Sequence, residues 1–288
     1  MKTDFDHLPD DKQQHIQLIK DVLLDAVDQA TESATGKKKN SRILMIILFG
    51  SYAKGTWVND PKSGYQSDYD ILVVLNKSEL IEEFKIWYAA EEHIERKTQT
   101  PVNLIVHTLS EVNHHLSEGH YFFNDIYQEG ALVYTNGEST LDTPGSLDPE
   151  EAKQIAQKHF DQWFDSANEF YEQYEFAKNK SRYKLAAFEL HQTTERLFAT
   201  ILLVYSNYKP RTHNLRRLYA FVIQQDDAFK EVFLQDTKFQ RRCFDLLRRA
   251  YIDARYSEHY RINEEELDWL AGRVQRLIEL TQEKCTKK

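Results

Sequence analysis

The residues from 43 to 75 constrain the fold most strongly, because they place two apolar segments on either side of a Gly-Ser turn. Residues 43–49, ILMIILF, are continuously apolar and predict a buried strand. Gly50 and Ser51 follow directly, and we expect a short helix over 52–56. Residues 69–75, YDILVVL, predict a second strand. The pattern indicates the centre of a β-sheet.

Two aspartates open the second of these strands. Successive side chains of a strand point to opposite faces, so Asp68 and Asp70 project to one side while Tyr69 and Ile71 face the other. Two carboxylates on one face suit Mg²⁺ or Mn²⁺, since such ions take carboxylates and complete their shell with water and phosphate oxygens. A helix that begins after Gly50 offers backbone N–H groups to phosphate. Together these features predict a nucleoside triphosphate held between backbone amides and a metal ion.

An apolar strand, a Gly-Ser turn and an apolar strand opened by Asp-x-Asp resemble the nucleotidyltransferase superfamily of DNA polymerase beta, in particular its minimal bacterial members. The resemblance implies that Asp68 and Asp70 are the catalytic metal ligands. It also implies nucleotide-binding residues, and we assign that role to four positions: Gly50, Ser51, Lys54 and Ser67.

The segment between Ser51 and Asp68 is longer than is usual in that family. It contains residues that favour turns, namely Asn59, Pro61, Ser63 and Gly64. An inserted loop beside the site is the simplest explanation.

Catalytic members of the superfamily carry a third carboxylate on a neighbouring strand, where it activates the attacking hydroxyl. The matching strand is 101–107, PVNLIVH, and the matching position is Asn103. An amide cannot act as a general base and is a weaker metal ligand than a carboxylate, so this departure argues against transfer chemistry but not against nucleotide binding. His107 shares a face with Asn103 and is a candidate base. The simpler interpretation of His107 is a strand-end histidine in ordinary hydrogen bonding.

Length and composition fit two domains with sizeable cores, since the chain has 288 residues of which 41% are hydrophobic. A formal net charge of −9 argues against a broad nucleic-acid-binding surface, although it allows a local basic patch. The two cysteines, Cys243 and Cys285, lack metal-binding spacing and fit a reducing compartment. The N-terminus is polar and acidic, and no apolar run reaches membrane-spanning length, so we expect a cytoplasmic protein with no membrane partner.

The first part of the chain has the alternating pattern of an α/β domain. Apolar residues recur at helical spacing near the N-terminus, at Ile16, Ile19, Leu23, Ala26 and Ala30, and Gly36 marks a helix end. Strands are expected at 42–49, 69–75, 102–106 and 131–134, with helices over 78–96 and from Ser110. We therefore predict a small mixed-sheet domain of the nucleotidyltransferase type over 1–142.

A linker rich in Gly, Ser, Thr and Pro separates this domain from a second one, running from Asn136 to Gly145. Asp148, Pro149 and Glu151 supply an N-cap, a first-turn proline and a capping-box acid for a long helix. Further helices are expected at 182–206, 213–224, 238–256 and 264–284. The expected fold class is α+β, with an all-α bundle over 148–288.

A stripe of apolar residues follows the first turns of that long helix: Phe160, Trp163, Ala167, Phe170 and Tyr174. We interpret the stripe as core or a dimer face rather than a base-stacking platform. His191 and Glu195 lie one helical turn apart further on. We interpret them as a structural hydrogen-bonding pair, with a ligand role as the alternative.

Residues 183–203, YKLAAFELHQTTERLFATILL, followed by 209–218, KPRTHNLRRL, resemble the HEPN domain, a helical bundle. Residues 248–256, RRAYIDARY, match its fourth helix. Fusion of a nucleotidyltransferase domain to a HEPN domain is a recognised bacterial arrangement, and the two resemblances cover nearly the whole chain. Because HEPN bundles commonly pair, the resemblance implies a homodimer.

Ribonucleases of the HEPN family carry an arginine followed, after about four to six residues, by a histidine, and the pair forms an active site across a dimer. The corresponding pair is Arg255 and His259. Only Tyr256, Ser257 and Glu258 separate the two residues, which is fewer than is usual in the family. Tyr256 also occupies the position where a polar residue often follows the arginine, so the sequence does not predict a ribonuclease.

Three arginines recur every seven residues along the same helix, at Arg241, Arg248 and Arg255. They form a row of guanidinium groups on one face, which suits phosphate. The alternative is a solvated basic face paired with Asp245 and Asp253.

Three functions follow as hypotheses. The leading one is Mg²⁺-dependent transfer of a nucleoside monophosphate from a nucleoside triphosphate to an acceptor hydroxyl of a protein, RNA or small molecule. The second is a nucleotide- or RNA-binding regulator in which transfer is lost at Asn103. The third is a HEPN-type ribonuclease, as in toxin–antitoxin-like proteins, that uses Arg255 and His259. The sequence specifies neither the acceptor nor the base of the nucleotide.

Overall fold

The computed structural model describes residues 1–32, 34–60 and 65–287. They form two compact units, Met1–Leu147 and Asp148–Lys288, and each is described by itself. The predicted inserted loop lies largely outside the described residues, which do not include Pro61, Ser63 or Gly64. The residues on either side of it, β2 (Asn59–Asp60) and β3 (Tyr65–Gln66), pair as a short antiparallel ribbon.

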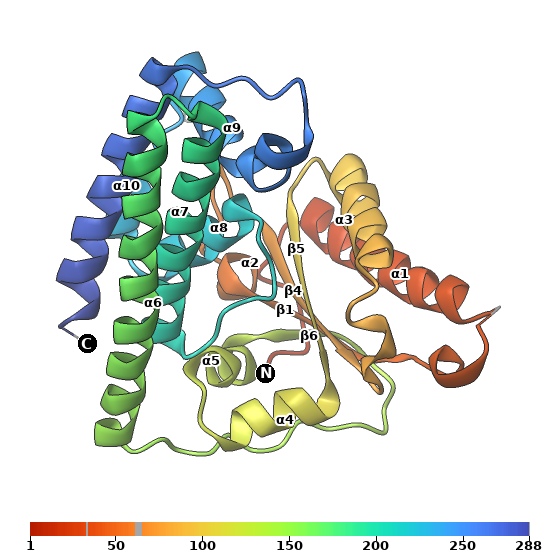
Figure 1. Ribbon diagram of the computed structural model, residues 1–288. Coiled ribbons are helices and arrows are strands. Elements are labelled where there is room, and N and C mark those ends of the chain that lie inside the picture. Colours follow the sequence, from red (N-terminus) through yellow and green to blue (C-terminus); the bar gives the residue numbers. More distant parts are fainter. Residues whose placement is uncertain (33, 61–64, 288) are drawn as a thin grey trace. The chain divides into compact units, whose positions relative to one another are not determined.

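A mixed four-stranded sheet lies at the centre of the first unit (Figure 1). Its strands are β1 (Ile43–Phe49), β4 (Tyr69–Leu75), β5 (Val102–Thr108) and β6 (Ala131–Thr135), in the order β5-β4-β1-β6. β4 and β5 run parallel, whereas β1 is antiparallel to both of its neighbours. Every residue of β1 and β4 is buried, which explains why both strands read as continuous apolar runs.

Helices cover both faces of this sheet (Figure 1). One layer consists of α1 (Asp10–Glu32) and α3 (Phe84–Thr98), and the other of α4 (Leu109–Ser117) and α5 (Tyr121–Glu129). The main core lies under α1 and α3, where Ile19 and Leu23 pack with Tyr69, Ile71 and other inward residues. Since side chains alternate along β4, Asp70 points to the opposite face.

Several helical regions of this unit differ from the sequence expectation. The stretch expected as one helix over 78–96 is a 3-10 turn, η2 (Ser78–Leu80), followed by α3 from Phe84. Helix α5 is not among the expected elements, and its sequence YFFNDIYQE is rich in aromatic residues and other weak helix formers. Burial of Phe123 and Ile126 against the sheet outweighs that weak propensity. Helix α1 ends at Glu32, before the predicted end at Gly36, and Gly36 instead begins a further 3-10 turn, η1 (Gly36–Lys38).

The described residues of the second unit form helices without strands (Figure 1). The helices are α6 (Pro149–Asn179), α7 (Tyr183–Ser206), α8 (Leu215–Gln225), η3 (Asp227–Glu231), α9 (Lys238–Tyr256) and α10 (Glu264–Cys285). Asp148 caps α6, because its side chain accepts hydrogen bonds from the backbone N–H groups of Glu150 and Glu151. α7 contacts α6, α8, α9 and α10 and is buried around most of its circumference, as expected of a central helix.

The apolar stripe of α6 packs mainly against α7. Ala167 and Tyr174 are buried, while Trp163 and Phe170 are half-buried. The guanidinium of Arg196 on α7 lies over both half-buried rings, 4.8 Å from the centroid of Trp163 and 5.7 Å from that of Phe170. Cation–π contacts of this kind occupy the ring faces that a stacking base would need.

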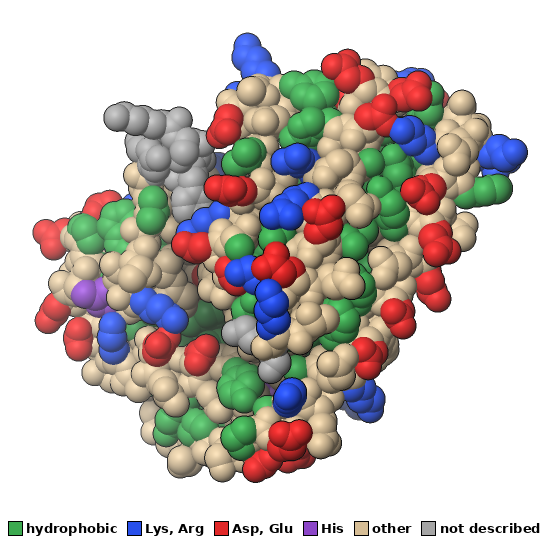
Figure 2. All heavy atoms as spheres, turned by 90° about the vertical axis from the view of Figure 1, so that its left-hand side faces the viewer, with side chains coloured by type: hydrophobic (Ala, Val, Ile, Leu, Met, Phe, Trp, Pro, Cys, Tyr) green, Lys and Arg blue, Asp and Glu red, His purple; other side chains and the backbone are tan. Residues whose placement is uncertain are grey.

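Acidic and basic side chains are interspersed on the face of the molecule that Figure 2 draws. That face therefore does not offer the continuous basic surface needed for non-specific nucleic-acid binding. Among residues 1–32, 34–60 and 65–287, no helix is both long enough and apolar enough to cross a bilayer.

Candidate functional site

Asp68 and Asp70 lie together at the start of β4. Asp70 is fully buried and Asp68 is half-buried. One donor serves both carboxylates: Nδ2 of Asn103 lies 3.1 Å from Oδ2 of Asp68 and 3.0 Å from Oδ1 of Asp70. The two side chains therefore converge on one point, as strand alternation requires.

The register of the sheet brings Asn103 to this point. β4 and β5 are parallel neighbours, and Asn103 is paired directly with Asp70. The amide carries two N–H donors and no charge, so it can hold two mutually repelling carboxylates close together. The amide cannot, however, act as a general base at neutral pH.

Gly50 lies against the same carboxylate. Its φ is +71°, and a Cβ placed on it would lie only 2.3 Å from Oδ2 of Asp70. Both the left-handed backbone and this close approach require glycine. Because β1 and β4 pair Phe49 with Asp70, the turn that leaves β1 is fixed beside the aspartates.

Helix α2 (Gly50–Lys54) begins at this glycine, two residues earlier than the sequence suggests. It contains five residues and is followed by its C-cap, Gly55, whose φ is +79°. So short a helix has little macrodipole, and its value for phosphate binding lies in the first-turn N–H groups that have no acceptor within the helix. Gly50 and Ser51 carry two of these groups.

Lys54 and Ser67 both have protein partners. Nζ of Lys54 lies 2.6 Å from Oε2 of Glu129 in a half-exposed ion pair. Ser67 is buried, and its Oγ accepts a hydrogen bond of 2.9 Å from the N–H of Val58. The N–H of Ser67 donates in return to the carbonyl of Val58 at 2.8 Å. Ser67 therefore ties the segment around Val58 to the start of β4.

The structure does not bring His107 to the aspartate pair. His107 is four residues beyond Asn103 on β5, which corresponds to about 13 Å along a strand. Its Nδ1 lies 3.3 Å from Oε2 of Glu111, and its ring contacts that of Phe123 with centroids 5.5 Å apart. The geometry thus favours the interpretation of His107 as a strand-end histidine in a local hydrogen bond.

His107 instead borders a group of histidines at the junction of α4 and α5. The ring centroids of His107 and His115 are 5.9 Å apart, and those of His115 and His120 are 4.7 Å apart. Burial, reinforced by the neighbouring histidines, lowers the pKa of His115 to about 4, so its imidazole is neutral at neutral pH. This group is not among the candidates expected from the sequence, although the run HHLSEGH at 114–120 is its signal.

The candidate residues of the second unit, Arg255, Tyr256 and His259, lie at its surface. The guanidinium of Arg255 lies over the rings of Phe188, Tyr251 and Tyr256, at 5.0, 4.6 and 4.9 Å from their centroids. Its Nε also donates to the carbonyl of Tyr251 at 2.6 Å. The side chain of His259 is 88% exposed. Arg255 is therefore held against aromatic rings, while His259 projects into solvent.

The other arginines of the predicted row have protein acceptors too. Nη1 of Arg241 donates to the carbonyls of Gln235 and Asp236, at 2.6 and 3.0 Å. Nη2 of Arg248 lies 2.5 Å from Oδ1 of Asp245. Of the two acids expected to pair with the row, Asp245 pairs with Arg248, whereas Asp253 pairs with Arg249, which is not part of the row. The interactions favour the alternative of a solvated face, with acid pairing at Arg248.

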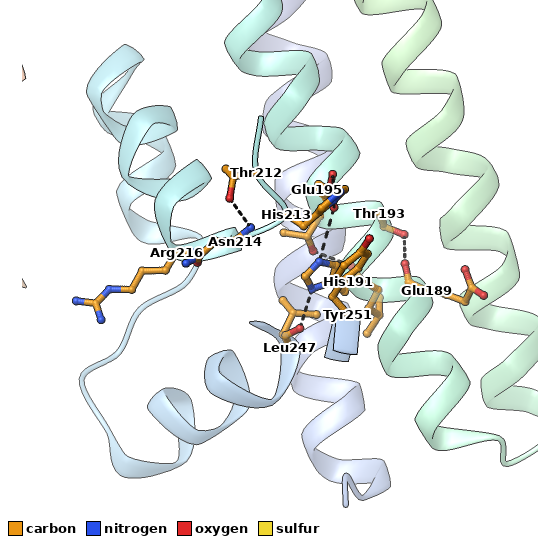
Figure 3. Close-up of polar contacts among 12 residues, drawn as sticks. Glu189, His191, Thr193, Glu195, Thr212, His213, Asn214, Arg216, Leu247 and Tyr251 are labelled. Atoms are coloured by element: carbon orange, nitrogen blue, oxygen red, sulfur yellow. Dashed lines mark hydrogen bonds and ion pairs between the residues drawn. The ribbon is translucent and has the colours of Figure 1, made fainter. Parts of the chain in front are cut away.

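A buried carboxylate connects three segments of the helical unit (Figure 3). Glu195 on α7 is 5% exposed, and each of its oxygens lies 3.0 Å from Nδ1 of His213. Nε2 of His191 and Nζ of Lys209 lie slightly further away, at 3.7 and 3.8 Å. Tyr251 of α9 stacks on His213 with ring centroids 4.5 Å apart.

These neighbours determine the charge of Glu195. Burial alone would raise its pKa, but the nearby His191, the hydrogen-bonded His213 and the ammonium of Lys209 outweigh burial and lower the pKa to about 2. Nδ1 of His191 is engaged with the carbonyl of Leu247 at 3.0 Å. The carboxylate therefore links α7 to the segment that precedes α8, and its histidine partners extend the network to Leu247 and Tyr251 of α9. This arrangement fits the structural interpretation of His191 and Glu195.

Comparison with known families agrees with this geometry. Residues 35–139 match the family model described as polymerase beta, nucleotidyltransferase, and residues 160–284 match that of the HEPN domain. The chain joins a polymerase beta nucleotidyltransferase domain to a HEPN domain. Both resemblances inferred from the sequence are thereby confirmed, and so is the α+β fold class. No curated protein matches the sequence with significance.

The first match contains all four strands of the main sheet, the turn at Gly50 and both aspartates. A nucleotidyltransferase domain implies that the protein binds a nucleotide. The HEPN match begins within α6 and ends within α10, so it includes the Glu195 network and the arginines of α9.

Proposed function

We propose that the nucleotidyltransferase domain binds a nucleoside triphosphate with Mg²⁺ at Asp68 and Asp70 and transfers a nucleoside monophosphate to an acceptor hydroxyl of a protein, RNA or small molecule. The observation that carries the proposal is the convergence of both carboxylates on Nδ2 of Asn103, directly beside Gly50. We further propose that the HEPN domain pairs two chains into a homodimer.

The donor set fits the proposed metal. Asp68 and Asp70 supply carboxylate oxygens, which Mg²⁺ and Mn²⁺ prefer, and the half-buried Asp68 leaves one side accessible to water and phosphate. When bound, the ion would neutralise charge on the triphosphate oxygens.

The phosphate contacts are assigned to the turn at Gly50 and Ser51. Without a side chain at Gly50, phosphate oxygens can approach the backbone N–H groups closely. Lys54 would exchange Glu129 for the leaving pyrophosphate. Because a half-exposed ion pair contributes only about 0–1 kcal/mol, a triphosphate can compete with Glu129 for the ammonium.

In the proposed reaction the acceptor oxygen bonds to the α-phosphorus, and the bond from that phosphorus to the α–β bridging oxygen breaks. Pyrophosphate leaves, and the hydroxyl proton passes to water because Asn103 cannot accept it. General base catalysis typically contributes about 10²–10⁴-fold, so we expect slower transfer than with a carboxylate at that position. Positioning and charge stabilisation supply the rest of the rate enhancement.

A second candidate function is a nucleotide- or RNA-binding regulator without transfer. The observation that favours it is the amide of Asn103 at the position where a base is needed. The ribonuclease hypothesis has less support, since Arg255 is engaged with three aromatic rings and His259 is solvent-exposed.

Labelled nucleotides distinguish the two candidates. The purified protein is incubated with each α-labelled ribonucleoside triphosphate and Mg²⁺, with and without added RNA, and both pyrophosphate release and labelled products are measured. The proposal predicts label on protein, RNA or a small molecule, together with pyrophosphate. Triphosphate binding in a parallel calorimetric titration, without either product, would identify the nucleotide-binding regulator. Failure to bind any triphosphate would contradict the transferase and the nucleotide-binding form of the regulator.

A further inference from the structure

The junction of α4 and α5 gathers three residues whose side chains can bind a metal ion. His115 lies in the last turn of α4, Glu118 is the C-cap of that helix, and His120 is the N-cap of α5. Their ligand atoms all lie within 4.8 Å of one another. Among the described residues, no other group of three His, Cys, Asp or Glu side chains has this spacing.

The backbone of the junction brings the two histidines together. α4 ends in a Schellman motif, in which the N–H of His120 donates to the carbonyl of His115 and the N–H of Gly119 to that of Leu116, both at 3.0 Å. Gly119 has the positive φ, +71°, that this motif requires. A Cβ on Gly119 would also lie 2.9 Å from the backbone nitrogen of Leu147. The chain therefore reverses sharply and returns His120 over His115.

Neighbouring side chains already hold these three residues in place. The ring of His115 stacks on that of Phe123, with centroids 4.6 Å apart and planes at 9°. Oε2 of Glu118 lies 3.2 Å from Nε2 of His120. Two ligands of a tetrahedral zinc ion lie about 3.3 Å apart, given bonds of about 2.0–2.1 Å, so this pair needs little movement.

The group is also accessible to an ion. The side chain of Glu118 is 50% exposed and that of His120 is 15% exposed, whereas His115 forms the inner side. Nε2 of the exposed His114 lies 3.5 Å from Oε2 of Glu118 and offers a fourth donor.

We propose that His115, Glu118 and His120 form a binding site for a divalent transition-metal ion of the Zn²⁺ type. Two imidazoles and one carboxylate suit Zn²⁺, Co²⁺ or Ni²⁺, whereas Mg²⁺ prefers oxygen ligands such as Asp68 and Asp70. The site is therefore separate in chemistry from the proposed nucleotide site. An ion held there would clamp the reversal between α4 and α5.

The test is titration of the full-length protein, freed of metal with a chelator, with Zn²⁺ in excess Mg²⁺, followed by calorimetry. Co²⁺ is titrated in parallel, because its visible absorption reports tetrahedral coordination by nitrogen and oxygen. The proposal predicts one high-affinity ion per chain, a tetrahedral Co²⁺ spectrum and a higher melting temperature with metal.

Variants assign the binding to these residues. Loss of a group that only hydrogen-bonds to a metal ligand costs roughly 10–100-fold in metal affinity. Loss of a ligand itself, in Glu118→Gln or His120→Ala, should therefore cost at least that much. Glu118→Gln is the decisive variant, because its side chain is half-exposed and the amide keeps the shape of the carboxylate. His259→Ala, at an exposed histidine of the HEPN domain, is the control and should leave affinity unchanged. Absence of binding, or binding that Glu118→Gln and His120→Ala leave unchanged, would overturn the proposal.

Discussion

Gly50 and Asp70 lie so close together that the backbone of one residue limits where the carboxylate of the other can lie. A Cβ at Gly50 would approach Oδ2 of Asp70 to 2.3 Å, and Phe49 and Asp70 are direct partners in the β1–β4 register. The turn assigned to phosphate and the residue assigned to metal therefore form one structural unit. A substitution at Gly50 should therefore shift the carboxylate of Asp70.

We expect Gly50→Ala to displace the Asp70 carboxylate and weaken Mg²⁺-dependent nucleotide binding. It also introduces strain at φ +71°, at a cost of about 1–3 kcal/mol. The matched control is Gly137→Ala, because Gly137 has φ +79° but open space around its Cβ position. Chemical denaturation and nucleotide titration of both variants test the prediction. If both variants lost the same stability and both kept the nucleotide affinity of the native protein, the explanation from the close approach of Gly50 to Asp70 would be contradicted.

Asn103→Asp should accelerate the proposed transfer reaction. The new carboxylate can activate the acceptor, so turnover should rise by about 10²-fold or more while nucleotide affinity changes little. Without Mg²⁺ the variant should be less stable, since two hydrogen bonds of about 1 kcal/mol each are replaced by repulsion from Asp68 and Asp70.

Asn103→Ala is the control for that experiment, because it removes the same hydrogen bonds without supplying a base. A labelled-product assay with a fixed acceptor compares the three proteins. Unchanged turnover in Asn103→Asp would show that base catalysis at this position does not limit the reaction.

The Glu195 network predicts a particular response to acid. The pKa of Glu195 is about 2 in the folded chain and about 4.3 in the unfolded chain. Between these two pH values the folded chain therefore binds fewer protons than the unfolded chain. The resulting stabilisation is complete above about pH 5 and is lost as the pH falls towards 2. Glu195→Gln should lower stability at neutral pH by about 1–3 kcal/mol and flatten this acid dependence. Urea unfolding at several pH values, with the exposed Glu172→Gln as control, measures both effects. An unchanged acid dependence would show that Glu195 remains protonated or is not coupled to folding.

The arginine row should contribute little to nucleic-acid binding. Replacing Arg241, Arg248 and Arg255 with Gln is expected to leave the salt dependence of RNA binding unchanged. The carboxylate of Asp245 offsets the charge of Arg248, Arg255 is held against three aromatic rings, and the chain has a formal net charge of −9, which opposes phosphate binding. If an arginine did bind an RNA phosphate, its replacement would reduce the slope of log affinity against log salt by about 0.7–0.9. Binding isotherms at several salt concentrations give that slope, and a clear reduction would restore the phosphate-binding alternative.

Much of the fold is predictable because its signals are local. The apolar runs of β1 and β4, the Asp148 cap of α6 and the bounds of α9 follow from neighbouring residues alone. The convergence of Asp68 and Asp70 is likewise a consequence of strand alternation.

The remaining features depend on tertiary interactions that sequence spacing does not reveal. Glu195 takes its main partner, His213, from a segment 18 residues away. Lys54 reaches Glu129 at the far end of α5, a helix that its own propensity does not predict. His115 and His120 meet only because Gly119 adopts a left-handed conformation between them. In each case the sequence contains both residues, but their spacing does not show that they are neighbours in the fold.

Mg²⁺-dependent triphosphate binding by the native protein and by Asp68→Asn/Asp70→Asn is the most direct test of the central claim. The substitutions preserve side-chain shape and remove the repulsion between the carboxylates, so the melting temperature of the metal-free protein should not fall. Calorimetric titration should show that the native protein binds a nucleoside triphosphate with Mg²⁺ and that chelation abolishes binding. The double variant should bind at least about a hundredfold more weakly, a loss of about 2.7 kcal/mol. Equal, Mg²⁺-dependent affinity in both proteins would contradict the assignment of the nucleotide site to Asp68 and Asp70.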